Sequence, residues 1–117
     1  MLNRIVLVGR LVRDAELRYT PGGVPVALAA LAVERPRAKG EEAEVDFVEL
    51  VLWRRLAENL TEHLRKGRLL AVEGRLQVRR YEGSDGRARK ASEVVVDGVT
   101  FLGKPPARTS ETGTAVP

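Results

Sequence analysis

Apolar side chains alternate with polar ones, or form short runs, along residues 2–102 in patterns that mostly predict strands. Residues 2–11 (LNRIVLVGRL) are rich in branched apolar side chains and predict a strand with a bend or bulge at Gly9. Residues 26–33 (VALAALAV) could form a helix by propensity alone. Their short length between Pro25 and Pro36 instead favours a strand buried on both faces. The polar and charged residues 35–44 predict a loop.

Residues 46–53 carry the clearest alternation in the chain. The period of two predicts one face with Val48, Leu50 and Leu52, and an opposite face with Phe47, Glu49, Val51 and Trp53. Phe47 and Trp53 are six residues apart, so on a strand they lie about 20 Å apart along one surface.

A helix and a hairpin complete the pattern. Leu56, Leu60 and Leu64 recur every four residues and predict a helix that stops at Gly67. Residues 70–79 alternate again, as in a half-buried strand, and residues 83–86 (GSDG) predict a turn back into a last strand at 91–102. Because one short helix cannot cover such a sheet, the sheet must close on itself. The prediction is an all-β, five-stranded barrel with one short α-helix between strands 3 and 4.

Composition excludes several classes of function. The 117 residues include no cysteine and one histidine, His63, so disulfides, thiolate catalysis and cysteine-based metal sites are excluded. No nucleophile with an acid–base pair is discernible, which predicts a protein that is not an enzyme and has no cofactor, metal or catalytic residue. No apolar run approaches the roughly 20 residues of a membrane span, so a cytoplasmic protein without membrane contact is expected.

The charge and the aromatic residues indicate a nucleic-acid partner. The net charge is +4, and arginine, which suits bidentate phosphate contacts, supplies 16 of the 20 positive side chains. Tyr81 follows Arg79 and Arg80 at the end of the strand after the helix. Aromatic rings on a sheet face with arginines between them can stack successive bases. The same rings could instead fill a second hydrophobic layer or a subunit contact, and the spacing alone leaves both possibilities open.

Several segments, collinear from residue 1 to about 102, resemble bacterial single-stranded DNA-binding proteins. They are residues 1–11 (MLNRIVLVGRL), 14–22 (DAELRYTPG), 51–59 (VLWRRLAEN), 64–67 (LRKG), 72–76 (VEGRL) and 92–96 (SEVVV). The resemblance implies an oligonucleotide-binding (OB) fold over residues 1–103 and a homotetramer around which single-stranded DNA wraps. Residues 104–117, with little to bury, are expected to be a disordered C-terminal tail.

The resemblance also assigns site residues. Phe47, Trp53 and Tyr81 fall where the family places stacking aromatics. The basic residues that it usually aligns along the DNA path correspond to Arg55, Lys66, Arg79 and Arg80. Residues 82–89 match the long loop between strands 4 and 5 that folds over DNA.

Some positions depart from the family pattern. Pro36 stands in a region where an aromatic is common, and Glu49 puts a negative charge on the face of Phe47 and Trp53. The loop acids Glu41, Glu42, Glu44 and Asp46 add to that charge. The chain ends at residues 113–117 (GTAVP) without the usual acidic tip that recruits replication and repair enzymes, which leaves its protein partners open.

The expected function is therefore binding of single-stranded DNA with little sequence preference. Such a protein protects the strand during DNA replication, recombination and repair, and is associated with the nucleoid. Two alternatives stay open, because a fold does not determine its ligand. One is a primosomal or RNA-binding relative with the same fold, and the other is a structural subunit that does not bind DNA.

Overall fold

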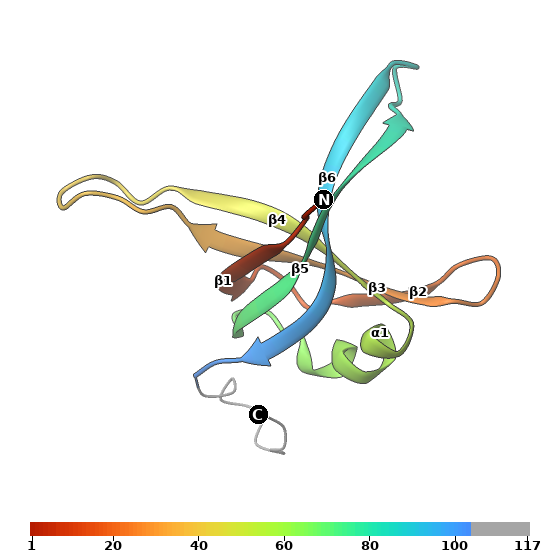
Figure 1. The fold of residues 1–117 in the computed structure, drawn as a ribbon, viewed down its shortest axis with the longest axis horizontal. Helices are drawn as coiled ribbons and strands as arrows, with labels where there is room; N and C mark the ends of the chain where they lie inside the picture. The colour runs from red at the N-terminus through yellow and green to blue at the C-terminus, as the bar shows by residue number, and fades with distance from the viewer. Residues whose placement is uncertain (104–117) are drawn as a thin grey trace.

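The computed structural model describes residues 1–103, which form six strands, one α-helix and a single 3₁₀ turn (Figure 1). Their bounds are β1 Ile5–Leu11, β2 Glu16–Tyr19, β3 Pro25–Glu34, β4 Val45–Trp53, α1 Arg54–Leu60, the 3₁₀ turn Thr61–His63, β5 Leu69–Glu82 and β6 Ala88–Phe101. The expected tail, residues 104–117, lies outside the described residues.

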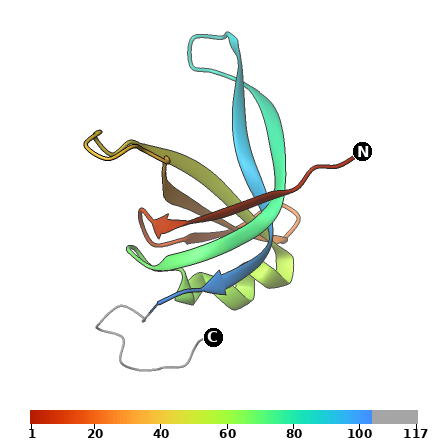
Figure 2. The ribbon, with the colours of Figure 1, turned by 60° about the vertical axis from the view of Figure 1, so that its left-hand side comes forward.

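Five of the strands close into a ring. The strands pair in the order β1-β5-β6-β4-β3-β2, and β1 pairs in addition with β3, so β2 alone lies outside the closed circuit as an extension of β3. Every pairing is antiparallel except β4 with β6. The predicted all-β class is confirmed, and α1 lies between the third and fourth strands of the ring, across one of its ends (Figure 2).

The core fills the inside of this ring. Leu31, Leu50, Leu52, Leu70 and Val94 have almost no exposed surface and come from four different strands. As the alternation in residues 46–53 predicts, Leu50 and Leu52 face the core, whereas Phe47 and Trp53 are exposed. The run at 26–33 is a strand, buried on both faces at Ala29, Ala30 and Leu31. Residues 35–44 are the connection between β3 and β4, as predicted.

Two local predictions were wrong, and one strand was missed. The α-helix ends at Leu60 and gives way to the 3₁₀ turn, because Leu64 is needed in the core and the Gly67 amide donates to the carbonyl of Leu11 in β1. β2 was not predicted at all, since none of its four residues is buried. The strand from residue 70 is half-buried only as far as Gly74, and beyond it Leu76 and Val78 are exposed where the β5–β6 hairpin projects from the ring (Figure 1).

Two glycines permit the backbones to approach closely where the ring bends and closes. A Cβ on Gly9 would overlap the carbonyl oxygen of Ala32, beside Arg10, where β1 pairs with both β5 and β3. Gly9 is therefore a point of close approach and not a bulge. The bulge lies in β5 at Glu73/Gly74, and a Cβ on Gly74 would overlap the carbonyl oxygen of Val95.

Substitution of these glycines by alanine should destabilise the protein, because a backbone oxygen cannot rotate away as a side chain can. We expect Gly9→Ala and Gly74→Ala each to lower the free energy of unfolding by about 2–3 kcal/mol or more. Gly98→Ala is the matched control, since a Cβ on Gly98, also in the sheet, meets nothing within 4 Å. Urea unfolding of the three variants checks this order, and an equal loss in Gly98→Ala would contradict it.

Candidate nucleic-acid interface

The side of the sheet that faces away from the core, here called the outer face, runs without interruption across the strands. Directly paired residues lie on the same face of a sheet, so the ladder register defines its members. They include Arg75, Gln77, Arg79 and Tyr81 of β5; Arg89, Ala91, Glu93 and Val95 of β6; Phe47, Glu49, Val51 and Trp53 of β4; Val26, Leu28, Ala30 and Ala32 of β3; Glu16 and Arg18 of β2; and Val6, Val8 and Arg10 of β1.

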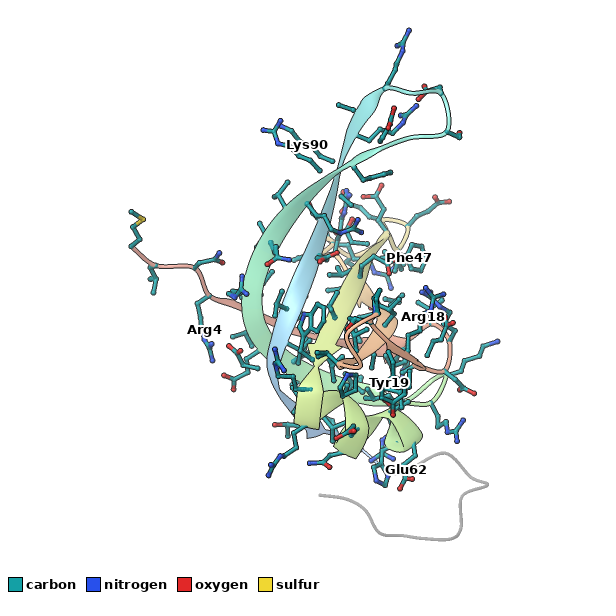
Figure 3. All side chains as sticks on the ribbon, turned by 90° about the vertical axis from the view of Figure 1, so that its right-hand side faces the viewer. Arg4, Arg18, Tyr19, Phe47, Glu62 and Lys90 are labelled. Atoms are coloured by element: carbon teal, nitrogen blue, oxygen red, sulfur yellow. The ribbon has the colours of Figure 1, made fainter. Side chains whose placement is uncertain are left out.

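All three candidate stacking residues lie on the outer face and are exposed. Phe47 has 69% of its surface exposed, Tyr81 44% and Trp53 40%. Phe47 and Arg18 project on the same side of the sheet, whereas Arg4 lies on the other side of the molecule (Figure 3). Phe47 and Trp53 belong to β4, and Tyr81 belongs to β5, with β6 between these two strands. The face thus presents three separated rings and not one aromatic cluster.

A small buried layer lies between the rings. Ala30, Val51 and Val95 are buried although they point away from the core. The sequence left open whether the rings themselves fill a second hydrophobic layer. Within residues 1–103 they do not, because these smaller side chains occupy that layer while the rings remain exposed.

Ion pairs cross the outer face on both sides of this layer. Arg13, just after β1, lies 3.7 Å from the Glu49 carboxylate, and Ala30 is the ladder partner of Glu49. On the other side, the Arg79 Nε donates to Glu93 over 3.3 Å. Both glutamates are adjacent in the parallel β4–β6 ladder. The acidic centre of the face is therefore flanked by arginines on each side.

The four basic residues expected along the DNA path are not all on this face. Arg79 lies on it, next to Tyr81, with its guanidinium carbon 5.7 Å from the ring centroid. Arg80 pairs with Lys90 and so points to the opposite side of the β5–β6 hairpin. Lys90 indeed projects away from Phe47 (Figure 3).

Arg55 and Lys66 lie near the helix. Arg55 is exposed in the first turn of α1, two residues after Trp53. The residue between them, Arg54, has a left-handed backbone with φ 58°, at the point where the chain turns from β4 into α1. That conformation costs a non-glycine residue about 1–2 kcal/mol, and such strain often accompanies functional sites.

Lys66 belongs to the turn that joins the helix region to β5. Its backbone amide donates to Asp14 over 2.8 Å, and Arg65 donates to the same carboxylate. The hydrogen bond from the Lys66 amide contributes most, and together with that from Arg65 it holds the pKa of Asp14 below its ordinary value. Lys66 is thereby placed at the end of β1, beside Arg10, whose guanidinium donates to the Gly67 carbonyl.

The loop at 35–44 is organised by arginines and acids. The Arg35 guanidinium donates to both Asp46 and Glu44. These contacts hold the pKa of Asp46 below its ordinary value and raise that of Arg35. A hollow of about 350 Å³ in this loop is lined by Arg35, Pro36, Arg37, Glu41, Glu42 and Glu44. Of the acids at positions 41, 42, 44 and 46, Glu44 and Asp46 are therefore paired with Arg35.

Sequence reasoning did not assign Arg75, Gln77 or Glu93 to the site. Alternation in residues 75–81 (RLQVRRY) could have placed Arg75 and Gln77 beside Arg79 and Tyr81. No group of three or more histidine or acidic residues in the described part of the chain could hold a metal ion. Nor does that part contain a helix long and apolar enough to span a membrane.

The amino-acid sequence is similar to those of known single-stranded DNA-binding proteins. The single-strand binding protein family matches residues 2–102. Single-stranded DNA-binding protein 3 of Listeria innocua is 53% identical over 103 residues, which are 87% of this chain and 64% of that protein. Single-stranded DNA-binding protein A of Bacillus subtilis is 52% identical, over 87% of this chain and 60% of that protein. The chain thus spans less than two thirds of the length of these relatives.

A solved structure shares the fold. A complex of Plasmodium falciparum SSB with single-stranded DNA superposes with a TM-score of 0.78 at 25% identity, over 88% of this chain and 96% of that one. The predicted OB-fold class is confirmed by this likeness. Because the family matches nearly all of the described residues, this chain belongs to the single-strand binding protein family.

Proposed function

We propose that this chain binds single-stranded DNA with little sequence preference and protects it during DNA replication, recombination and repair. The observation that carries the proposal is the outer face, where three exposed rings and the arginines that flank its acidic centre lie on paired strands. Stacking on rings tolerates any base, since every base has a π-face. The relatives named above are single-stranded DNA-binding proteins, which supports the same ligand here.

In the proposed mechanism, aromatic side chains contact the bases and basic side chains contact the phosphates. Phe47, Trp53 and Tyr81 stack bases, while Arg79 and Arg55 contact the phosphates. Lys66 and Arg80 extend the positive charge at the margins, because neither shares the outer face with the rings. This is a binding role without catalysis, and it implies a cytoplasmic protein associated with the nucleoid. Oligo-dT, RNA and duplex DNA compared in one titration test the ligand, and a preference for RNA or duplex would overturn the proposal.

Trp53 is the side chain whose removal tests stacking most directly. Trp53→Ala should weaken the binding of labelled oligo-dT by about 1–3 kcal/mol, because one base loses its stacking partner. Since Trp53 is the sole tryptophan, DNA should also quench the tryptophan emission of the unmodified protein. Tyr19→Ala is the matched control, as Tyr19 is exposed but lies on the other face of β2 from Arg18. Equal losses in both variants, or none in a folded Trp53→Ala, would contradict stacking.

Arg79 and Arg80 allow a charge-matched test of which face the DNA follows. The slope of log K against log salt is about −0.7 for each phosphate neutralised on a single strand. Arg79→Gln should weaken binding and flatten this slope by somewhat less than one, and Arg80→Gln should change both less. Glu49→Gln should tighten binding, because it removes a like charge from the approach of the phosphates. A larger effect of Arg80 than of Arg79 would place the DNA elsewhere.

We further propose a homotetramer, as the family resemblance implies. In support, Val6 and Val8 of β1 are 63% and 52% exposed, which leaves apolar surface for a subunit contact. Light scattering at micromolar concentration should give the mass of four chains, and Val8→Glu should lower it. Val78→Glu, at a position with 53% exposure on the projecting hairpin, should not lower the mass. A monomer mass for the unmodified protein would refute the assembly.

A further inference from the structure

Glu93 is the one buried carboxylate among residues 1–103, and it lies on the proposed DNA-binding face. Only 8% of its surface is exposed, although the neighbouring Glu49 in the ladder is largely open to solvent. Burial of a charged carboxylate is costly unless hydrogen bonds compensate it. The Glu93 carboxylate therefore needs hydrogen-bond donors close to it. A carboxylate buried on a face that is otherwise largely exposed is expected to have a specific role.

Both oxygens of Glu93 have a partner from β5. Oε1 accepts a hydrogen bond from the Nε of Arg79, and Oε2 accepts one from the side-chain amide of Gln77, each at 3.3 Å. Gln77 is the direct ladder partner of Glu93, so its amide closes the side of the carboxylate that Arg79 does not reach. The carboxylate is held by these two neighbours.

These contacts determine where the Arg79 guanidinium lies. Its Nε is directed to Glu93, while its central carbon lies 5.7 Å from the centroid of the Tyr81 ring, within the range of a cation–π contact. Within the described residues, its hydrogen bond to Glu93 is the only one that the Arg79 side chain makes. Nη1 and Nη2 are thus left for other acceptors, such as phosphate oxygens.

We propose that Glu93 is a positioning residue for nucleic-acid binding, which acts by holding Arg79 against Tyr81. The inference rests on the proposed function. Arg79 covers one side of the Tyr81 ring and presents its Nη groups to the DNA backbone, while the other side of the ring receives a base. An arginine that is ordered before the ligand arrives loses less conformational freedom on binding, which strengthens the complex.

A glutamate in this place could also act by charge alone, and the two roles predict opposite signs. If Glu93 only repels phosphates, Glu93→Gln binds DNA more tightly. If it positions Arg79, the same substitution weakens binding, because a neutral amide holds a guanidinium less strongly than a carboxylate does. Glu49→Gln is the matched control, since it removes the same charge from the adjacent ladder position without a link to Arg79.

The experiment measures the affinity for labelled oligo-dT in the unmodified protein and its folded variants, with thermal unfolding recorded alongside. We expect Glu93→Gln to bind about 3- to 10-fold more weakly, as one preorganised side chain is lost, while Glu49→Gln binds more tightly. In an Arg79→Gln background, Glu93→Gln should weaken binding no further. A loss that persists in that background, or a gain in the single variant, would overturn the inference.

A second variant keeps the test valid if Glu93→Gln does not fold. Arg79→Lys retains the charge at a half-exposed site but lacks the planar guanidinium that reaches Glu93 and covers Tyr81. It should reproduce the loss, and affinity equal to the unmodified protein would overturn the inference. Failure of the unmodified protein to bind oligo-dT at low salt would instead refute the proposed function itself.

Discussion

The strands of this protein can close into a ring only because β1 and β3 approach closely at Gly9. The next residue, Arg10, pairs with both β5 and β3, and no side chain at Gly9 could fit against the carbonyl of Ala32. Gly74 likewise permits close approach at the bulge in β5, where a Cβ would overlap the carbonyl oxygen of Val95 in β6. Because a ring has no free edges among its members, closure both buries the core leucines and removes strand edges that would invite aggregation.

Closure of the ring also creates the surface on which the proposed function depends. The inside of the ring takes one set of alternating side chains, so the other set must form the outer face. β4 contributes Phe47 and Trp53 to that face, and the part of β5 that extends beyond the bulge at Gly74 contributes Tyr81. All three rings therefore project from hydrogen-bonded strands, which hold their backbone positions on the outer face.

Arginine–glutamate ion pairs have two effects on the outer face. Acids sit at its centre and arginines around them, in the pairs Arg13–Glu49 and Arg79–Glu93. Each pair lowers the net positive potential that a phosphate would meet, yet it also orders a long side chain. Exposed pairs such as Arg13–Glu49 add little to stability, whereas in Arg79–Glu93 the carboxylate is buried and one of its hydrogen bonds comes from Arg79. The two arginine–glutamate pairs thus differ in burial, although their glutamates are partners in the β4–β6 ladder.

Features that depend on local periodicity could be predicted from the amino-acid sequence. Alternation over residues 46–53 separated Leu50 and Leu52 from Phe47 and Trp53, and the short apolar run, the loop and the hairpin turn were recognisable from their own residues. Four features became visible only in the fold: β2 exists, the helix ends at Leu60, Arg80 lies on the opposite face from Arg79, and Glu93 is buried. The physical reason is that each of these depends on a partner distant in the chain. β2 forms because β3 offers an edge, the helix stops because the following turn bonds to β1, and Glu93 is buried because ring closure brings β5 and β4 to either side of it.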